Sequence, residues 1–246
     1  MEHAVKSAGV RMEDIVYAHH VLKEIITATP LQRDARLSAE YGCNVYLKRE
    51  DLQVVRSFKI RGAYHLIRTL PEERLKRGVV CASAGNHAQG VALSCSSLKI
   101  PGKIYMPATT PRQKVSQVAA YGGAFVEIVL TGDTFDDAFA EAVKESEASG
   151  MAFIHPFDDA KIIAGNGTVG KEIMEGIDQS VDYVFVTVGG GGLASGVGTY
   201  IKTISPSTRV IGVEPEGAPA MKRSMEQQRV VTLDRIDKFV DGAAVK

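Results

Sequence analysis

The sequence predicts an α/β protein in which mostly parallel, twisted sheets carry helices on both faces. Short apolar runs alternate with helical segments from residue 78 to residue 213. Several of these runs are apolar at every position, which is typical of strands buried between two helical layers. The chain has 246 residues with 45% apolar content, enough for one large or two modest domains.

The elements before residue 78 are a helix, a short strand and a second helix. Apolar residues recur at helical spacing from 12 to 26, and Thr29-Pro30 ends that helix. A strand is expected over 44–47. Ser57 is a suitable N-cap for a helix that runs to about Leu70, where Pro71 stops it.

From residue 78 the chain alternates between the two kinds of element, as expected for parallel strands joined by helical crossovers. The predicted strands cover 78–82, 103–106, 124–130, 153–154, 183–188 and 209–213, and the predicted helices cover 86–98, 112–121, 133–148, 160–174 and 194–204. In sheets of this kind, ligands bind at the carboxyl ends of the strands.

Composition argues against several classes of partner. Lys plus Arg and Asp plus Glu each total 29, so no basic excess favours nucleic acid. Residues 1–10 contain no apolar run of signal-peptide length, and no stretch approaches the ~20 apolar residues of a membrane span. Three cysteines without CxxC spacing indicate reduced thiols in a cytoplasmic protein and give no support to zinc binding.

Four consecutive glycines follow the strand that ends at Val188. Gly189, Gly190, Gly191 and Gly192 precede Leu193 and a helix. Such a turn permits close backbone approach and directs N–H groups at an anion, which predicts a phosphate site. The run lacks dinucleotide spacing and the Lys-Ser/Thr of a P-loop. The alternative is a tight turn with close helix–sheet packing.

A second strand end carries Ser83, Ala84, Gly85, Asn86 and His87. Small residues expose backbone N–H groups at a helix start, which suits a carboxylate. The Asn86 side chain can donate to a ring hydroxyl. His87 is either a general base or, more commonly for a histidine at a helix start, a structural hydrogen-bonding group.

Lys59 follows a third strand, after a short loop. In the first turn of a helix, the positive end of the helix dipole lowers the pKa of a lysine. A lysine must be neutral to attack a carbonyl and form a Schiff base. The alternative is an exposed surface lysine. Together the three strand ends suit a phosphorylated aldehyde cofactor bound as an imine.

Seven motifs resemble those of the fold-type-II pyridoxal-phosphate enzymes, and among them most closely the biosynthetic threonine ammonia-lyases (threonine dehydratases). They are 29–31 (TPL), 47–53 (LKREDLQ), 57–63 (SFKIRGA), 83–87 (SAGNH), 110–114 (TPRQK), 153–158 (FIHPFD) and 189–193 (GGGGL). The resemblance covers nearly the whole chain. It implies a tryptophan-synthase-β-like fold and the cofactor pyridoxal 5'-phosphate.

The resemblance also implies a role for each motif residue. Lys59 is the Schiff-base lysine and then the acid/base at the substrate α-carbon, and Asn86 contacts the ring hydroxyl. The backbone of Gly189, Gly190, Gly191, Gly192 and Leu193 holds the phosphate, and Ser83, Ala84, Gly85, Asn86 and His87 bracket the substrate carboxylate. The implied reaction removes water from L-threonine to give 2-oxobutanoate and ammonia in isoleucine biosynthesis, with L-serine as a second substrate.

Two departures from related serine racemases favour elimination. Racemases carry a second acid/base serine where this chain has Ala84. They also bind a divalent metal through a glutamate and an aspartate six residues on. Glu214 matches the first ligand, but Ala220 stands at the second, so no metal site is predicted.

The resemblance implies further expectations about organisation. A small subdomain, about 78–154, is inserted in a larger one formed by 1–77 and 155–246. Residues 239–246 resemble a mid-domain segment, so sheet-completing strands, a serine facing the pyridine nitrogen and any isoleucine-sensing regulatory domain are expected to lie outside this chain. The family suggests a homodimer or homotetramer. The alternatives are a serine racemase or dehydratase, and a non-catalytic phosphate- or nucleotide-binding fragment.

Overall fold

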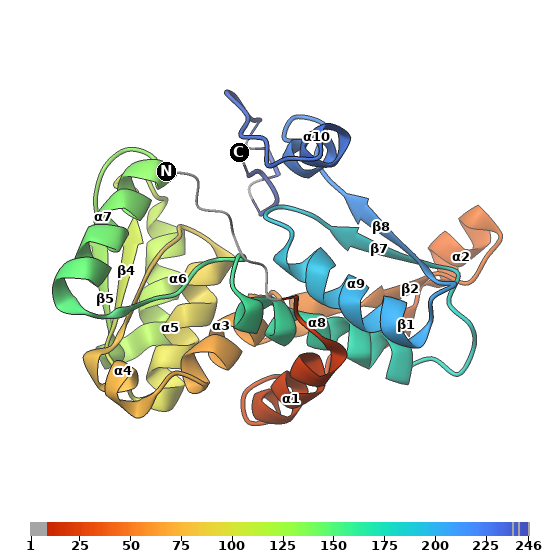
Figure 1. Ribbon diagram of the computed structural model, residues 1–246, viewed down its shortest axis with the longest axis horizontal. Coiled ribbons are helices and arrows are strands. Elements are labelled where there is room, and N and C mark those ends of the chain that lie inside the picture. The colour runs from red at the N-terminus through yellow and green to blue at the C-terminus, as the bar shows by residue number, and fades with distance from the viewer. Residues whose placement is uncertain (1–8, 238, 241, 246) are drawn as a thin grey trace.

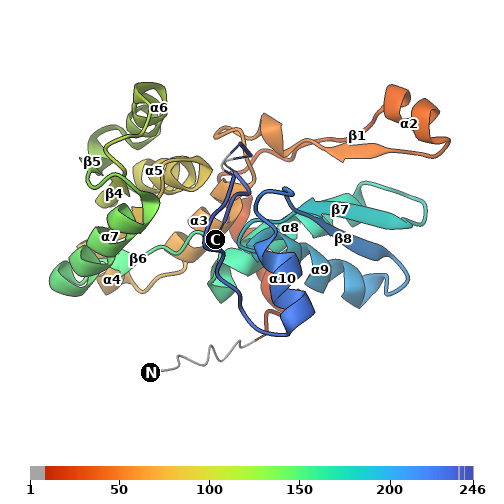
Figure 2. The same ribbon diagram turned by 90° about the horizontal axis from the view of Figure 1, so that it is seen from above.

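A computed structural model describes residues 9–237, 239–240 and 242–245. Most of the N-terminal segment 1–10, and Asp241 and Lys246 of the segment 239–246, lie outside the described residues. The chain forms two bodies, one containing β3 to β6 and the other containing β7, β8, β1 and β2 (Figure 1). Helix α3 lies between them in both views (Figures 1 and 2).

The predicted alternation of strands and helices is confirmed. The helices are α1 (Met12–Leu22), α2 (Ala35–Tyr41), α3 (Lys59–Arg68), α4 (Glu72–Arg77), α5 (Asn86–Leu98), α6 (Arg112–Gly122), α7 (Phe135–Ser149), α8 (Ala160–Glu175), α9 (Gly192–Ile204) and α10 (Ala220–Gln227), with short 3-10 turns η1 (Glu50–Leu52) and η2 (Gly123–Phe125). The strands are β1 (Leu31–Arg33), β2 (Tyr46–Lys48), β3 (Val79–Ala82), β4 (Gly102–Met106), β5 (Val126–Leu130), β6 (Ala152–Phe153), β7 (Tyr183–Thr187) and β8 (Arg209–Val213).

The larger sheet is parallel, in the order β5-β4-β3-β6. Alternate residues of β3 point to opposite helical layers. Val79 and Cys81 pack with apolar residues of α3 and α5, while Val80 and Ala82 pack with α7. Helices therefore cover both faces, as the apolar pattern of this strand predicts. All four strands lie between Val79 and Phe153, and the division into subdomains stays a proposal.

The parallel pair β7–β8 is covered by helices on one face only. Val184 and Val186 pack with residues of α8 and α9. Tyr183 and Phe185, on the other face, are 50% and 70% exposed. Among the described residues, the apolar side chains on this second face of the pair are therefore not covered by a helical layer.

Several elements were not predicted. β1 and β2 form an antiparallel pair, with Leu31 opposite Lys48. The strand expected over 44–47 begins two residues later, and α2, α4 and α10 had no predicted counterpart. These helices are six to eight residues long, too short to display an apolar period. No helix in the described ranges is long and apolar enough to cross a membrane.

Small residues let α3 approach α8 closely. A Cβ atom added at Gly62 would lie 2.8 Å from the Asn166 Oδ1 atom, and one at Gly165 would lie 2.6 Å from the Arg61 carbonyl oxygen. The Gly62 N–H also donates to Asn166 Oδ1 at 3.1 Å. This contact fixes the helix that begins with Lys59 against the second body.

We expect Gly165→Ala to lower the free energy of unfolding by about 1–3 kcal/mol, because its methyl group would overlap the α3 backbone. Gly198→Ala in α9 is the matched control. A Cβ there meets no described atom within 4 Å, so helix propensity raises stability by up to about 1 kcal/mol. Urea denaturation monitored by circular dichroism measures both, and equal effects of the two substitutions would contradict the packing argument.

Candidate active site

Lys59 is the first residue of α3, as its predicted place in the first turn requires. The N-cap is Phe58, without a side-chain hydrogen bond, so the expectation that Ser57 caps the helix is wrong. Arg56, just before Ser57, has a φ of +58°, and the helix begins one residue later than predicted. The Ser57 Oγ atom is buried and has no hydrogen-bond partner among the described residues.

The Lys59 amine is held by a backbone carbonyl. Its Nζ donates to the Pro156 oxygen at 2.9 Å and lies 5.4 Å from the centre of the Phe58 ring. Burial lowers the pKa of Lys59 from 10.5 to about 8. The predicted direction is therefore correct, although removal of the charge from water is the cause. The amine is partly neutral near physiological pH and can act as a nucleophile.

The glycine turn presents a row of free N–H groups. β7 ends where the Val188 N–H donates to Val213, and α9 begins at Gly192 after Gly191, whose φ is +85°. No described residue accepts a hydrogen bond from the N–H groups of residues 189–194, and Ser195 is the next to donate, to the Gly191 oxygen at 2.9 Å. A phosphate is the ligand that such a turn can hold.

The loop after β3 leaves a second set of N–H groups free. The Ser83 N–H donates to Tyr105, and the Gly85 N–H to the Ser83 Oγ at 3.1 Å. Within the described ranges, the N–H groups of residue 84 and of residues 86–88 have no acceptor. Asn86 is exposed at the helix start, and its side chain makes no hydrogen bond to a described residue. A carboxylate fits these donors.

His87 lies in the interior. Its ring is buried, and Nε2 lies 2.9 Å from the Ile154 oxygen, so this nitrogen donates. Burial, aided by the charge of Lys59, lowers the pKa of His87 to about 3. The imidazole is neutral and too weakly basic for proton transfer near pH 7. The geometry thus favours the structural alternative for its side chain, while a role for its backbone N–H stays a prediction.

The segment after β6 touches all three predicted strand ends. The Ile154 oxygen accepts from His87, the Pro156 oxygen accepts from Lys59, and Phe157 lies against Gly190. The motif FIHPFD at 153–158 contains these residues, and the family resemblance implies no role for them. Main-chain oxygens carry two of these contacts, so side-chain chemistry could not have identified them.

A buried network of charges supports the start of α3. Arg61 is fully buried, and its guanidinium donates to Glu50 at 2.7 and 2.8 Å and to Glu172 at 2.6 and 2.8 Å. Lys48 lies 2.6 Å from Glu172 and also donates to the Thr29 oxygen at 2.6 Å. Two cations thus neutralise two carboxylates.

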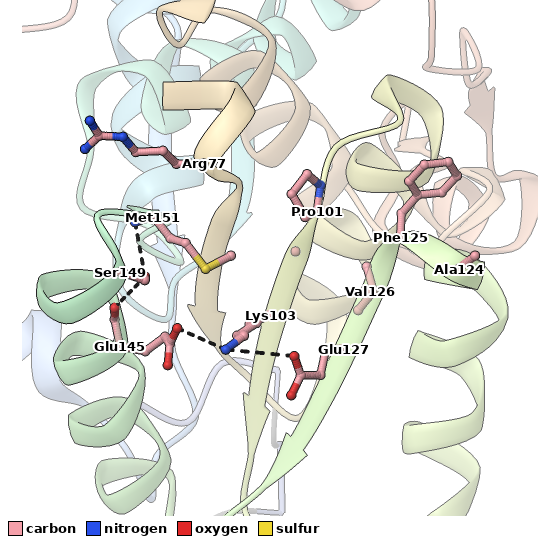
Figure 3. Close-up of a pocket in the computed structure, with 11 residues that line it drawn as sticks. Arg77, Pro101, Lys103, Ala124, Phe125, Val126, Glu127, Glu145, Ser149 and Met151 are labelled. Carbon is pink, nitrogen blue, oxygen red and sulfur yellow. Dashed lines mark hydrogen bonds and ion pairs between the residues drawn. The ribbon is translucent and has the colours of Figure 1, made fainter. Parts of the chain in front are cut away.

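A hollow of about 480 Å³ lies at the opposite, amino-terminal edge of the larger sheet (Figure 3). Gly102 and Val126, which line it, are the first residues of β4 and β5. Its lysine, Lys103, is paired with Glu145 at 3.0 Å and Glu127 at 3.9 Å. The hollow therefore lies at the edge of the sheet opposite the carboxyl ends of the strands, where the candidate site is. The charge of Lys103 is already paired with two carboxylates.

Glu214, the residue that matches a racemase metal ligand, caps α10. Its carboxylate accepts the N–H groups of Met221 and Lys222, each at 2.8 Å. No group of three His, Cys, Asp or Glu side chains suited to a metal occurs within the described ranges. The prediction that there is no metal site stays a prediction.

Comparison with known proteins identifies the family. The model of the pyridoxal-phosphate dependent enzyme family matches residues 22–246, so the chain belongs to that family. It is 64% identical over 237 residues to the biosynthetic L-threonine dehydratase IlvA of Halalkalibacterium halodurans, with 96% of this chain and 57% of the relative covered. The chain thus spans little more than half the length of that relative.

Solved structures agree. The processed form of threonine deaminase isoform 2 from Solanum lycopersicum matches with a TM-score of 0.90 and 45% identity, covering 95% of this chain and 63% of that one. Maize serine racemase matches with a TM-score of 0.91 and 32% identity, covering 96% and 71%. The chain has the architecture of fold-type-II pyridoxal-phosphate enzymes, as predicted.

The residues present fit the family's cofactor. Among the described residues, the N–H groups of the turn at 189–194 and the exposed Asn86 amide have no hydrogen-bond partner, so they can hold a phosphate and a ring hydroxyl. The lowered pKa of Lys59 leaves its amine available for an aldehyde. All three come from strand ends that contact residues 154–157.

We expect the rate at which the chain takes up pyridoxal phosphate to rise with pH, with a midpoint near 8. Only the neutral amine attacks, and a pKa of about 8 instead of 10.5 makes its neutral fraction at pH 7 about 300-fold larger. Stopped-flow absorbance measures the rate, and N-acetyl-lysine is the control. A midpoint near 10.5 would contradict the burial of this amine.

Proposed function

We propose that this chain carries the catalytic region of a pyridoxal-phosphate lyase that converts L-threonine to 2-oxobutanoate and ammonia by β-elimination of water. The proposal rests on the contact of residues 154–157 with Lys59, His87 and Gly190. This contact brings together a lysine of lowered pKa and two sets of N–H groups that have no acceptor among the described residues. The choice of threonine as substrate follows the names of the Halalkalibacterium halodurans and Solanum lycopersicum relatives.

Different residues of the chain bind the cofactor phosphate, orient the substrate and transfer the proton. The N–H groups of Gly189 to Leu193 hold the phosphate, and those of the loop 83–87 orient the substrate carboxylate. When bound, the cofactor supplies an electron sink for the bonds at the substrate α-carbon. Lys59, once free, takes the α-proton at Nζ, and its lowered pKa suits both uptake and return of that proton.

Ala84 supports elimination over racemisation. A racemase needs a proton donor on each side of the α-carbon, and the methyl group of Ala84 cannot donate. The relatives' names favour threonine as the main substrate, and the proposal includes serine as a second one. The alternative, a serine racemase or dehydratase, draws on the structural likeness to the maize enzyme.

The wider setting is part of the same proposal. The relatives' description as biosynthetic favours a place in isoleucine synthesis, and the absence of a spanning helix among the described residues is compatible with the cytoplasm. The proposal includes a homodimer or homotetramer, on family resemblance, and a small subdomain of about residues 78–154.

We expect the chain, with pyridoxal phosphate, to release 2-oxobutanoate from L-threonine faster than pyruvate from L-serine, with D-serine as a minor product. A coupled dehydrogenase assay and chiral chromatography measure the three products, with the Halalkalibacterium relative assayed in parallel. D-serine formation that outpaces elimination would contradict the Ala84 argument. Absence of 2-oxobutanoate, while the relative is active, would contradict the proposed activity of this chain.

A further inference from the structure

The ring of Phe157 occupies the space where a side chain at position 190 would begin. A Cβ atom added at Gly190 would lie 2.2 Å from the ring Cγ and 2.3 Å from both Cδ atoms. Real Cβ atoms do not approach other atoms this closely. The backbone conformation of Gly190 does not require glycine, since its φ is not positive, in contrast to Gly191. Contact with Phe157 is therefore a constraint that only glycine meets at this position.

The same residue contacts the turn at a second point. A Cβ atom added at Gly192 would lie 2.7 Å from the Phe157 carbonyl oxygen and 3.2 Å from its Cα atom. Residue 157 thus lies against both Gly190 and the first residue of α9, on either side of the left-handed Gly191. Gly189 differs, because a Cβ atom added there would lie 3.3 Å from Ala243 and Val245 and would not approach Phe157.

Phe157 is itself held firmly. The His155 ring meets it edge to face, with centroids 4.8 Å apart at 87°. The Nδ1 atom of His155 accepts the N–H groups of Phe157 at 3.3 Å and Asp158 at 2.8 Å. Burial lowers the pKa of His155, so this nitrogen stays unprotonated and remains an acceptor near neutral pH.

We propose that Phe157 is a positioning residue for the phosphate turn: it supports Gly190 and Gly192 and thereby aligns the free N–H groups of residues 189–194 on the anion. The inference rests on the proposed cofactor site. It assigns the glycines different purposes, because Gly190 accommodates Phe157 while Gly191 supplies the left-handed turn. The neighbouring Pro156 oxygen accepts from Lys59, so a single dipeptide aligns the phosphate site and the amine.

A size exchange tests the proposal. Gly190→Ala should weaken the affinity for pyridoxal phosphate about tenfold or more, because its methyl group displaces the turn or the ring. The double variant Gly190→Ala with Phe157→Ala gives the methyl group room, so its affinity should exceed that of Gly190→Ala alone. Without cofactor, the melting temperature of the double variant should likewise exceed that of Gly190→Ala alone. Gly189→Ala is the matched control, whose defect Phe157→Ala should not relieve.

Two probes separate a positioning role from simple core packing. Phe157→Leu, which keeps an apolar side chain, should weaken binding of pyridoxal phosphate several-fold while leaving binding of pyridoxal, which lacks the phosphate, unchanged. Absorbance titration measures both. Equal losses for the two probes, or no rescue in the double variant, would overturn the inference alone. An unsubstituted chain that binds pyridoxal and pyridoxal phosphate equally well would overturn the proposed phosphate site as well.

Discussion

The geometry of the site depends on the buried ion pairs that the Arg61 guanidinium makes with Glu50 and Glu172. Arg61 lies two residues after Lys59 and holds carboxylates from η1 and α8 on its two edges. Although burial opposes its charge, the hydrogen bonds to Glu50 and Glu172 raise the pKa of Arg61 further. Breaking a buried pair of this kind leaves an unpaired charge and costs about 3–5 kcal/mol.

Lys48 and Lys59 differ in whether a carboxylate lies within hydrogen-bond distance of the amine. Lys48 lies beside Glu172 and remains an ion-pair partner. Lys59 has no carboxylate in hydrogen-bond contact among the described residues and instead meets a carbonyl oxygen, so burial is not compensated and its pKa falls to about 8. The fold thus satisfies the charges that hold α3 in place and leaves the reactive amine poorly stabilised as an ammonium.

The end of β6 brings the remaining parts together. Ile154 fixes His87 at the start of α5, Pro156 contacts Lys59 at the start of α3, and Phe157 supports the turn at the start of α9. Three helix starts therefore share one short segment of chain. Among the described residues, the N–H groups at the starts of α5 and α9 lack acceptors, so they can bind an amino-acid carboxylate and a phosphate. The Lys59 amine at the start of α3 can react with an aldehyde.

The sequence predicted the parts of the site better than the contacts between them. Glycines after Val188 and small residues after Ala82 are local patterns, and they correctly predicted helices that begin with free N–H groups. The pairing of Arg61 with Glu172 joins residues 111 apart, and charge alone does not predict such a partner. Ser57 is not the N-cap, because the helix begins at Lys59 and the cap position falls on Phe58, a boundary of one residue that local sequence does not determine.

We propose Lys59 as the nucleophile of a pyridoxal-phosphate site. Borohydride reduction of the cofactor-loaded chain, followed by peptide mass spectrometry, tests this assignment, with Lys76→Met, at an exposed lysine of α4, as a matched variant. We expect one pyridoxyl-modified peptide, containing Lys59, that is retained in Lys76→Met and lost in Lys59→Ala. A modified peptide that persists in Lys59→Ala, or one that maps to another lysine, would contradict it.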